Sequence, residues 1–222
     1  MKLSQMIDEI YLLVKDDSFF DTDAKKEDIT RRINDAVKYA CGHPGVEVPA
    51  LRKMGSFTTV EGVAYAEISG IAANFTGRIL RVGEPGKVKI YQALEDLYDD
   101  YYPLDLEGDV EAVCVVGNTM WYQGIPATAT QVVCVLQDDP EAVTYDATGV
   151  LDPDIPLIPD ALQLRVIAHY IAMDLYDKIE DGIDGQKANK INSQREHSIG
   201  LQKWMEFLGQ RRQHNKTSHW RY

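Results

Sequence analysis

Residues 146–159 read Asp-Ala-Thr-Gly-Val-Leu-Asp-Pro-Asp-Ile-Pro-Leu-Ile-Pro, and they separate two kinds of sequence. The three prolines of this bridge hold the residues before them in extended geometry. Residues 51–143, before the bridge, form short β-like runs, and after it an apolar stripe at helical spacing begins behind Asp160, a suitable N-cap. The bridge therefore delivers the chain from a β block into a long helix, which predicts an α+β fold.

Helical patterns also precede the β block. Apolar residues recur at helical spacing over residues 3–14 and again over residues 27–39. Thr22 or Asp23 could cap the second of these helices. The sequence therefore predicts two helices before the first strand.

Two more helices are predicted behind the bridge, over residues 160–180 and 186–208. His169 lies beside the apolar face of the first, where a core or interface histidine is the expected role. The middle of the last helix, residues 192–197, is polar, so this helix is either partly solvated or covered by a neighbour.

Short strands and turn signals fill the β block. Residues 78–82 and 87–91 alternate in polarity around a Gly/Pro loop and predict a hairpin. Residues 94–101 have the spacing of a short helix that ends before a proline, and Gly-Asn at 117–118 predicts a two-residue turn between two strands. A further strand is predicted over 128–136, and six or so strands at this spacing favour a small sandwich or barrel.

The predicted architecture is therefore α+β with three parts. Residues 1–50 and 155–208 are expected to form one helical bundle from the N- and C-terminal helices. Residues 51–154 are expected to form a small antiparallel β domain, sandwich- or barrel-like, inserted into that bundle. Residues 209–222 are expected to form an extended C-terminal arm.

The C-terminal arm differs in charge from the rest of the chain. The whole chain carries 23 basic and 35 acidic residues, a net charge of −12, yet residues 207–222 contain no carboxylate side chain. Four of the 23 basic residues lie there, which leaves 19 against 35 acids before it, a net charge of −16. Composition allows either a docking segment or a frayed terminus. The candidate docking residues are Arg211, Arg212, His214, Lys216, His219, Trp220, Arg221 and Tyr222.

Bulk properties exclude several classes of protein. No apolar run approaches the roughly 20 residues that span a bilayer, so no membrane partner is expected, and the first residues lack a secretory signal. Cys41, Cys114 and Cys134 are odd in number and widely spaced, which argues against a disulfide framework and a CxxC metal site. The strong negative charge disfavours a large nucleic-acid-binding face.

No motif in the sequence predicts catalysis. There is no Gly-rich phosphate loop, no His-Glu-x-x-His and no Gly-x-Ser-x-Gly elbow, and the histidines are scattered. We therefore predict no catalytic residues, no metal site and no cofactor. Paired carboxylates are plentiful and are expected to be solvated charge: Asp16/Asp17, Asp99/Asp100, Asp138/Asp139 and Asp152/Asp154.

Four segments in a fixed order carry a family resemblance. They are Arg31-Arg32-Ile33-Asn34-Asp35-Ala36, Phe57-Thr58-Thr59-Val60-Glu61-Gly62-Val63-Ala64-Tyr65, Trp121-Tyr122-Gln123-Gly124-Ile125-Pro126 and Asp152-Pro153-Asp154-Ile155-Pro156. Over roughly residues 1–207 this order resembles the head–tail connector adaptors of tailed bacteriophages, also called head-completion or neck proteins. Each motif is loose, and the specificity lies in their order and spacing.

The resemblance implies a structural virion protein that is not an enzyme. Family members form a homo-oligomeric ring, commonly of twelve copies, beneath the portal protein. The ring extends the channel through which double-stranded DNA passes without sequence-specific binding, and it offers a platform to the stopper or tail protein. Localisation in the virion neck, after assembly in the host cytoplasm, follows.

Family C-terminal segments often grip the portal, which is the role this resemblance suggests for the C-terminal arm. The arm matches no family motif, so its assignment rests on its composition and position. It is expected to be disordered in the free protein and to order on binding. Two alternatives stay open: another neck or tail-completion protein, and a carboxylate-dependent virion hydrolase that would use Asp99 or Asp100 on a glycan or peptide.

Overall fold

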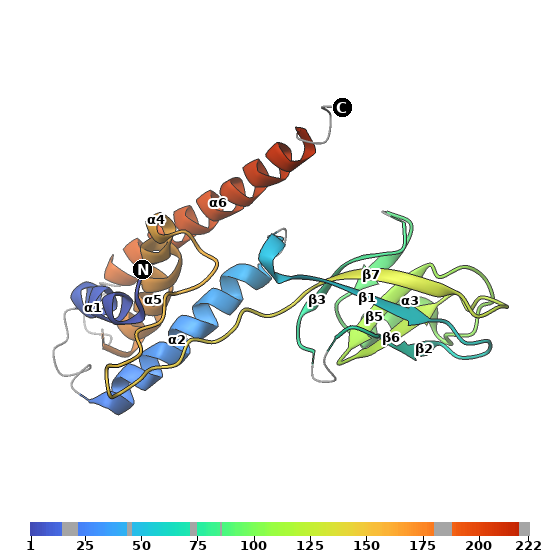
Figure 1. The fold of residues 1–222 in the computed structure, drawn as a ribbon, viewed down its shortest axis with the longest axis horizontal. Helices are drawn as coiled ribbons and strands as arrows, with labels where there is room; N and C mark the ends of the chain where they lie inside the picture. The colour runs from blue at the N-terminus through green and yellow to red at the C-terminus, as the bar shows by residue number, and fades with distance from the viewer. Residues whose placement is uncertain (15–21, 44–45, 72–74, 85, 180–187, 218–222) are drawn as a thin grey trace. The chain divides into compact units, whose positions relative to one another are not determined.

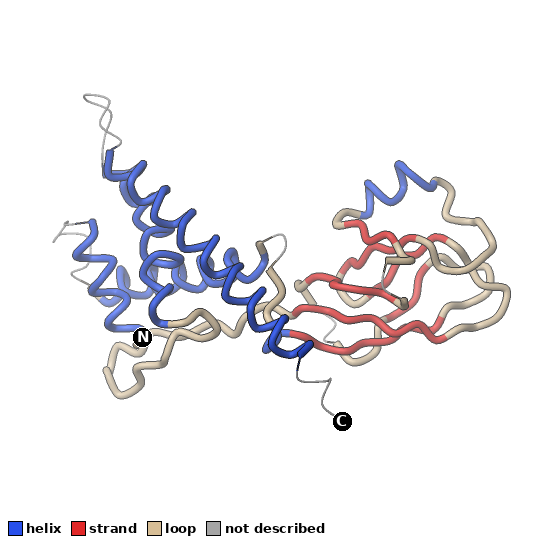
Figure 2. Tube along the Cα trace, turned by 90° about the horizontal axis from the view of Figure 1, so that it is seen from above, coloured by secondary structure: helices blue, strands red, loops and turns tan. Residues whose placement is uncertain are grey.

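The computed structural model shows an α+β protein (Figures 1 and 2). It describes residues 1–14, 22–43, 46–71, 75–84, 86–179 and 188–217. The chain divides into two compact units. The helical unit comprises residues 1–46 and 140–222, and the β unit comprises residues 47–139. Among the helices so described, none is long and apolar enough to cross a membrane.

The helical unit draws its elements from both ends of the chain. They are α1 (Leu3–Val14), α2 (Asp23–Gly42), α4 (Asp160–Gln163), the π-helix η3 (Leu164–Ala168), α5 (His169–Ile179) and α6 (Ala188–Thr217). Helix α5 packs against α1, α2 and α6, and η3 contacts the same three helices. Fully buried apolar side chains from each side of the insertion meet here, among them Met6, Ile33, Ile167 and Trp204.

The β unit contains two small sheets. Its elements are the 3-10 turn η2 (Pro49–Leu51), β1 (Arg52–Thr58), β2 (Tyr65–Glu67), β3 (Arg78–Val82), β4 (Lys89–Tyr91), α3 (Leu94–Tyr101), β5 (Ala112–Val116), β6 (Thr119–Gln123) and β7 (Gln131–Gln137). The strand orders are β1-β7-β3 and β2-β6-β5-β4. Both sheets contribute to one core, in which the Phe57 and Tyr122 rings stack with centroids 5.6 Å apart.

Local predictions in the β unit are confirmed. Strands β5 and β6 pair from Val116↔Thr119 onward, so Gly117-Asn118 is the two-residue turn, and Gly117 has the positive φ of 62° that such turns need. Helix α3 occupies the predicted residues 94–101.

Two predictions about strand pairing are wrong. Strands β3 and β4 do not form a hairpin, because β3 pairs with β7 while β4 pairs with β5 in the other sheet. The β unit is also not purely antiparallel, since β4 and β5 run parallel. The reason is α3, which lies between them in sequence and carries the chain back to the same end of the sheet. The two sheets do not close into a barrel.

The second boundary of the insertion also differs from the expected residue 154. Residues 140–154 belong to the helical unit. Asn34 of α2 holds them there, since its side chain donates to the Val143 carbonyl and accepts from the Val143 amide, both at 2.9 Å. The extended bridge thus lies along the helical unit rather than completing the β unit.

Residues 209–217 are not extended as predicted, because α6 is helical through Thr217. No proline occurs between Leu208 and Thr217 to stop the helix. Residues 218–222 lie outside the described residues. Figure 1 shows the last turns of α6 running on past α4 and α5.

Candidate functional site

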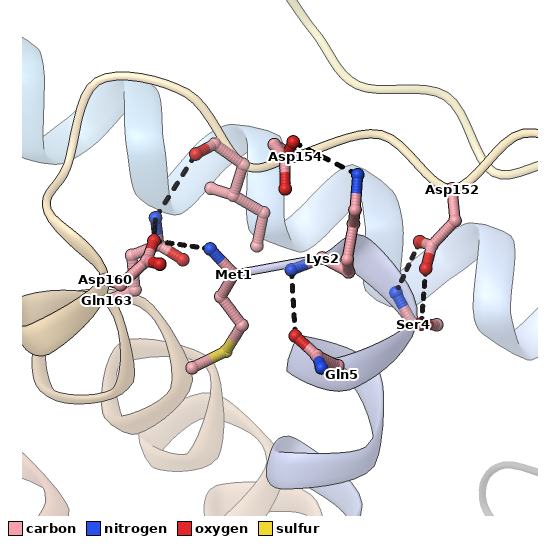
Figure 3. A network of polar contacts seen from close by, with 9 residues as sticks. Met1, Lys2, Ser4, Gln5, Asp152, Asp154, Asp160 and Gln163 are labelled. Carbon is pink, nitrogen blue, oxygen red and sulfur yellow. Dashed lines mark hydrogen bonds and ion pairs between the residues drawn. The ribbon is translucent and has the colours of Figure 1, made fainter.

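A polar clasp joins the start of α1 to the bridge before α4 (Figure 3). Asp152 accepts from the Ser4 amide at 3.0 Å and from the Ser4 hydroxyl at 2.7 Å, so it caps a helix 148 residues earlier in sequence. These two hydrogen bonds lower the pKa of Asp152. Lys2 pairs with Asp154 at 3.1 Å, and the Met1 amino group pairs with Asp160. Asp152 and Asp154 of the bridge therefore have a structural role, since they bind the start of α1.

The other predicted carboxylate pairs also have local partners. Asp100 accepts from Lys89 at 2.7 Å and from the Tyr91 hydroxyl, and the bond from Lys89 is the main cause of its lowered pKa. Asp138 pairs with Lys53. Asp16 and Asp17 lie outside the described residues. Asp139 accepts from the Thr76 hydroxyl, so each described pair contains at least one carboxylate engaged by a neighbouring side chain.

Cysteine and metal chemistry gain no support from the described residues. Cys41, Cys114 and Cys134 are buried, and none of these three described cysteines is in a disulfide. Burial raises the pKa of Cys134 to about 11, and burial also raises the pKa of Cys114, so neither is an activated thiolate. Within the described ranges, no group of three or more His, Cys, Asp and Glu side chains could hold a metal ion.

A hollow of about 570 Å³ lies beside Tyr170 in the helical unit. Its charged lining includes Arg32 and Asp174, which pair with each other. Arg32 also binds Asp28 at 2.8 Å. The Arg32–Asp174 pair therefore joins α2 to α5, and we assign no reaction to the hollow.

Two buried histidines, His197 of α6 and His169 of α5, lie where α6 packs on η3 and α5. His197 is 6% exposed, and its Nδ1 donates to the Val166 carbonyl at 3.0 Å. That carbonyl belongs to the π-helix η3, where the regular α-helical hydrogen-bond pattern is interrupted. His169, 8% exposed, lies 3.3 Å from the Ser193 hydroxyl of α6. In the polar middle of α6, Ser193 and His197 are thus buried against α5 and η3, whereas Asn192, Gln194 and Arg195 are exposed, and His169 is the core histidine that its position predicts.

Acid should weaken this contact. Burial lowers the pKa of both His169 and His197 below the ordinary value near 6.5. As pH falls below about 6.5 the unfolded chain takes up these protons before the folded chain does, so stability decreases until the folded pKa is reached. We expect a slope of up to about 1.4 kcal/mol per pH unit for each histidine, measured by urea unfolding between pH 7.5 and 5. The His169→Gln/His197→Gln variant should have a flatter slope, and an unchanged slope would contradict this assignment.

The predicted docking residues of the C-terminal arm fall into two groups. Arg211, Arg212, His214 and Lys216 lie on the last turns of α6, beyond Leu208, the last buried residue described on this helix. Their backbone is placed but their side chains are not described. His219, Trp220, Arg221 and Tyr222 lie outside the described residues.

A row of aromatic rings on the β unit was not predicted as a site. Tyr65 of β2 lies opposite Trp121 of β6, and their ring centroids are 5.1 Å apart. The row continues from Trp121 to Tyr98 of α3 at 6.4 Å and from Tyr98 to Tyr102 at 6.0 Å. We call these four residues the aromatic strip. Tyr65 is 52% exposed and Tyr102 is 80% exposed, so the strip is open to solvent at both ends.

The sequence contained part of the signal for the strip. Tyr65 and Trp121 both lie in segments that carry the family resemblance, but there they indicated only strands. Their contact requires the β2–β6 register, and Tyr98 joins them only because α3 lies on the same sheet. Alternation places a side chain on a face and does not say which neighbour it meets.

No protein-family model matches this chain, and a comparison with curated proteins gives no match.

Proposed function

We propose that the protein is a structural adaptor that forms a ring between the portal and the stopper or tail of a bacteriophage neck. The observation that carries this proposal is α6, a 30-residue helix whose described buried side chains end at Leu208 and whose continuation holds cations without carboxylates. Because α6 is packed in the helical unit up to Leu208, the residues that follow would be held in a fixed position to contact another protein. The order of the four segments that resemble head–tail connector adaptors suggests that this other protein is the portal.

The proposed architecture joins a helical bundle to an inserted β domain, with the C-terminal arm projecting from α6. Two compact units and a chain that leaves and re-enters the helical unit support this arrangement. In the assembled ring, the arm would contact the portal, and the β unit would offer a platform to the stopper or tail.

The acidic body suits a channel for moving DNA. Residues 1–206 carry a net charge of −16, so a ring of copies would repel phosphate and let duplex DNA slide. At physiological salt the screening length is about 8 Å, so only side chains facing the channel would act on the DNA. The ring would therefore contact DNA without binding a particular sequence.

Deleting residues 210–222 should abolish portal binding and leave the fold intact. The deletion removes the four cations and both terminal aromatics, while the buried residues of α6 up to Leu208 remain. Portal binding can be measured by co-sedimentation with purified portal rings, and folding by circular dichroism. The matched control carries the same thirteen residues in scrambled order, which separates net charge from specific contacts. Normal binding by the truncated protein would refute the role of the arm.

The alternatives differ in what they predict. Another neck or tail-completion protein would form a ring or plug without binding the portal directly. A hydrolase would act on cell-wall glycan or peptide, and its activity would fall in Asp99→Asn or Asp100→Asn. The engagement of Asp100 by Lys89 and Tyr91 favours the adaptor over the hydrolase.

A further inference from the structure

The aromatic strip lies on a sheet face that α3 covers only in part. One row of the four-stranded sheet runs Tyr65↔Trp121↔Cys114↔Tyr91 across β2, β6, β5 and β4. Helix α3 packs against β5 and β4, where Cys114 is fully buried. The half of this sheet face formed by β2 and β6 carries Tyr65 and Trp121 and lies beside α3 rather than beneath it. Tyr98 of α3 and Tyr102, which follows α3, continue the row of rings from Trp121.

Carboxylates border the strip on two sides. Glu67 follows Tyr65 by two residues on β2, so it projects from the same face of the sheet. Glu95 precedes Tyr98 by three residues on α3, so it lies on the same side of that helix. Both are exposed, and no cation of the described residues forms an ion pair with either. The surface therefore combines stacked π-faces with uncompensated negative charge.

Such a surface is suited to guanidinium and ammonium groups. Arg side chains stack on aromatic faces and bind carboxylates through a planar fork. In the same row of the sheet, outside the strip, the Lys89 ammonium lies 4.4 Å from the centre of the Tyr91 ring. Nucleic acid would also offer rings for stacking, but its phosphates would be repelled by Glu67 and Glu95.

We propose that the aromatic strip of one copy binds the C-terminal arm, residues 209–222, of a second copy of this chain. The arm has the complementary chemistry, with four cations, no carboxylate side chain, and Trp220 and Tyr222 to add to the aromatic row. Of the two ends of this acidic chain, the C-terminal one has the longer stretch without a carboxylate side chain. Where no portal engages the arm, the contact would link copies of the protein to one another.

A labelled peptide tests the contact directly. Fluorescence anisotropy of a peptide spanning Gly209–Tyr222, titrated with full-length protein, should show saturable binding that weakens as salt rises from 50 to 300 mM. The Glu67→Lys/Glu95→Lys variant should bind at least tenfold more weakly, and Tyr102→Ala several-fold more weakly. The matched control is Asp8→Lys/Glu27→Lys, the same charge change at exposed positions of α1 and α2, which should bind as the unmodified protein does. A peptide with its four cations replaced by Gln should not bind.

Sedimentation velocity distinguishes binding of the arm to a second copy from binding of the arm to the strip of its own chain. Full-length protein should associate in a concentration-dependent way, and both Glu67→Lys/Glu95→Lys and deletion of residues 210–222 should remove that association. The proposal is overturned by equal peptide affinity in Glu67→Lys/Glu95→Lys, or by full-length protein that stays monomeric because the arm binds only its own chain. Portal is absent from every assay, so failure here leaves the adaptor role untouched, and failure to bind portal leaves this contact untouched.

Discussion

The Gly124→Ala variant should lose about 3 kcal/mol or more of the stability of the β unit. Gly124 follows β6 with a φ of +83°, a conformation that costs an alanine roughly 1–2 kcal/mol. An added Cβ would also lie 1.9 Å from the Asp109 carbonyl oxygen and 2.8 Å from its carbon, both backbone atoms. They cannot rotate away, because the Glu111 amide donates to Gln123 and the Ile125 amide to Leu106, both at 2.9 Å. Thermal melting should show a fall of about 10 °C or more for a unit of this size.

Gly62→Ala is the matched control for this prediction. Gly62 has a similar φ of +71°, but nothing lies within 4 Å of its added Cβ. Only the backbone conformation should count there, at a cost of about 1–2 kcal/mol. Equal losses in the two variants would show that the close approach to Asp109 does not constrain Gly124.

The Gly200→Ala variant should destabilise the helical unit by about 1–3 kcal/mol, although alanine is the better helix former by about 1 kcal/mol. Gly200 lies on α6 where it crosses η3, and an added Cβ would meet Arg165 Cβ at 2.8 Å, Arg165 C at 3.0 Å and Val166 N at 3.1 Å. The two helices would have to separate, which would lengthen the hydrogen bond from His197 to the Val166 carbonyl. Urea unfolding followed by circular dichroism measures the loss.

Gly209→Ala on the same helix provides the opposite expectation. Nothing lies within 4 Å of its added Cβ, so alanine should stabilise α6 by up to about 1 kcal/mol. The pair therefore differs in sign although both changes are Gly to Ala in one helix. If Gly200→Ala also stabilised the protein, the close packing of α6 on η3 would be refuted.

Local chemistry accounts for most of what could be predicted. Apolar spacing predicted α1, α2, α3 and the helices behind the bridge, because helical period and burial of one face are encoded within a dozen neighbouring residues. The Gly117-Asn118 turn was predicted for the same reason, since the conformation of a two-residue turn depends on its own two residues.

Long-range pairing accounts for what could not be predicted. The sequences of β3 and β4 alternate well, yet the strands lie in different sheets, because the shared core of both sheets and the position of α3 decide their partners. The candidate sites divide in the same way. The basic composition of the C-terminal arm is visible in the sequence, whereas the aromatic strip requires three elements to be brought together.

The sequence by itself determined that this chain is an acidic α+β protein with two helical ends, a β block between them and a basic, aromatic C-terminal arm. Composition and residue spacing are properties of neighbouring residues, so they do not depend on the tertiary arrangement. Only the tertiary structure decided that His197 meets the Val166 carbonyl and that Tyr65, Trp121 and Tyr98 form one surface. These contacts join residues 23 to 56 positions apart, where partner choice follows from burying whole faces together rather than from any local signal.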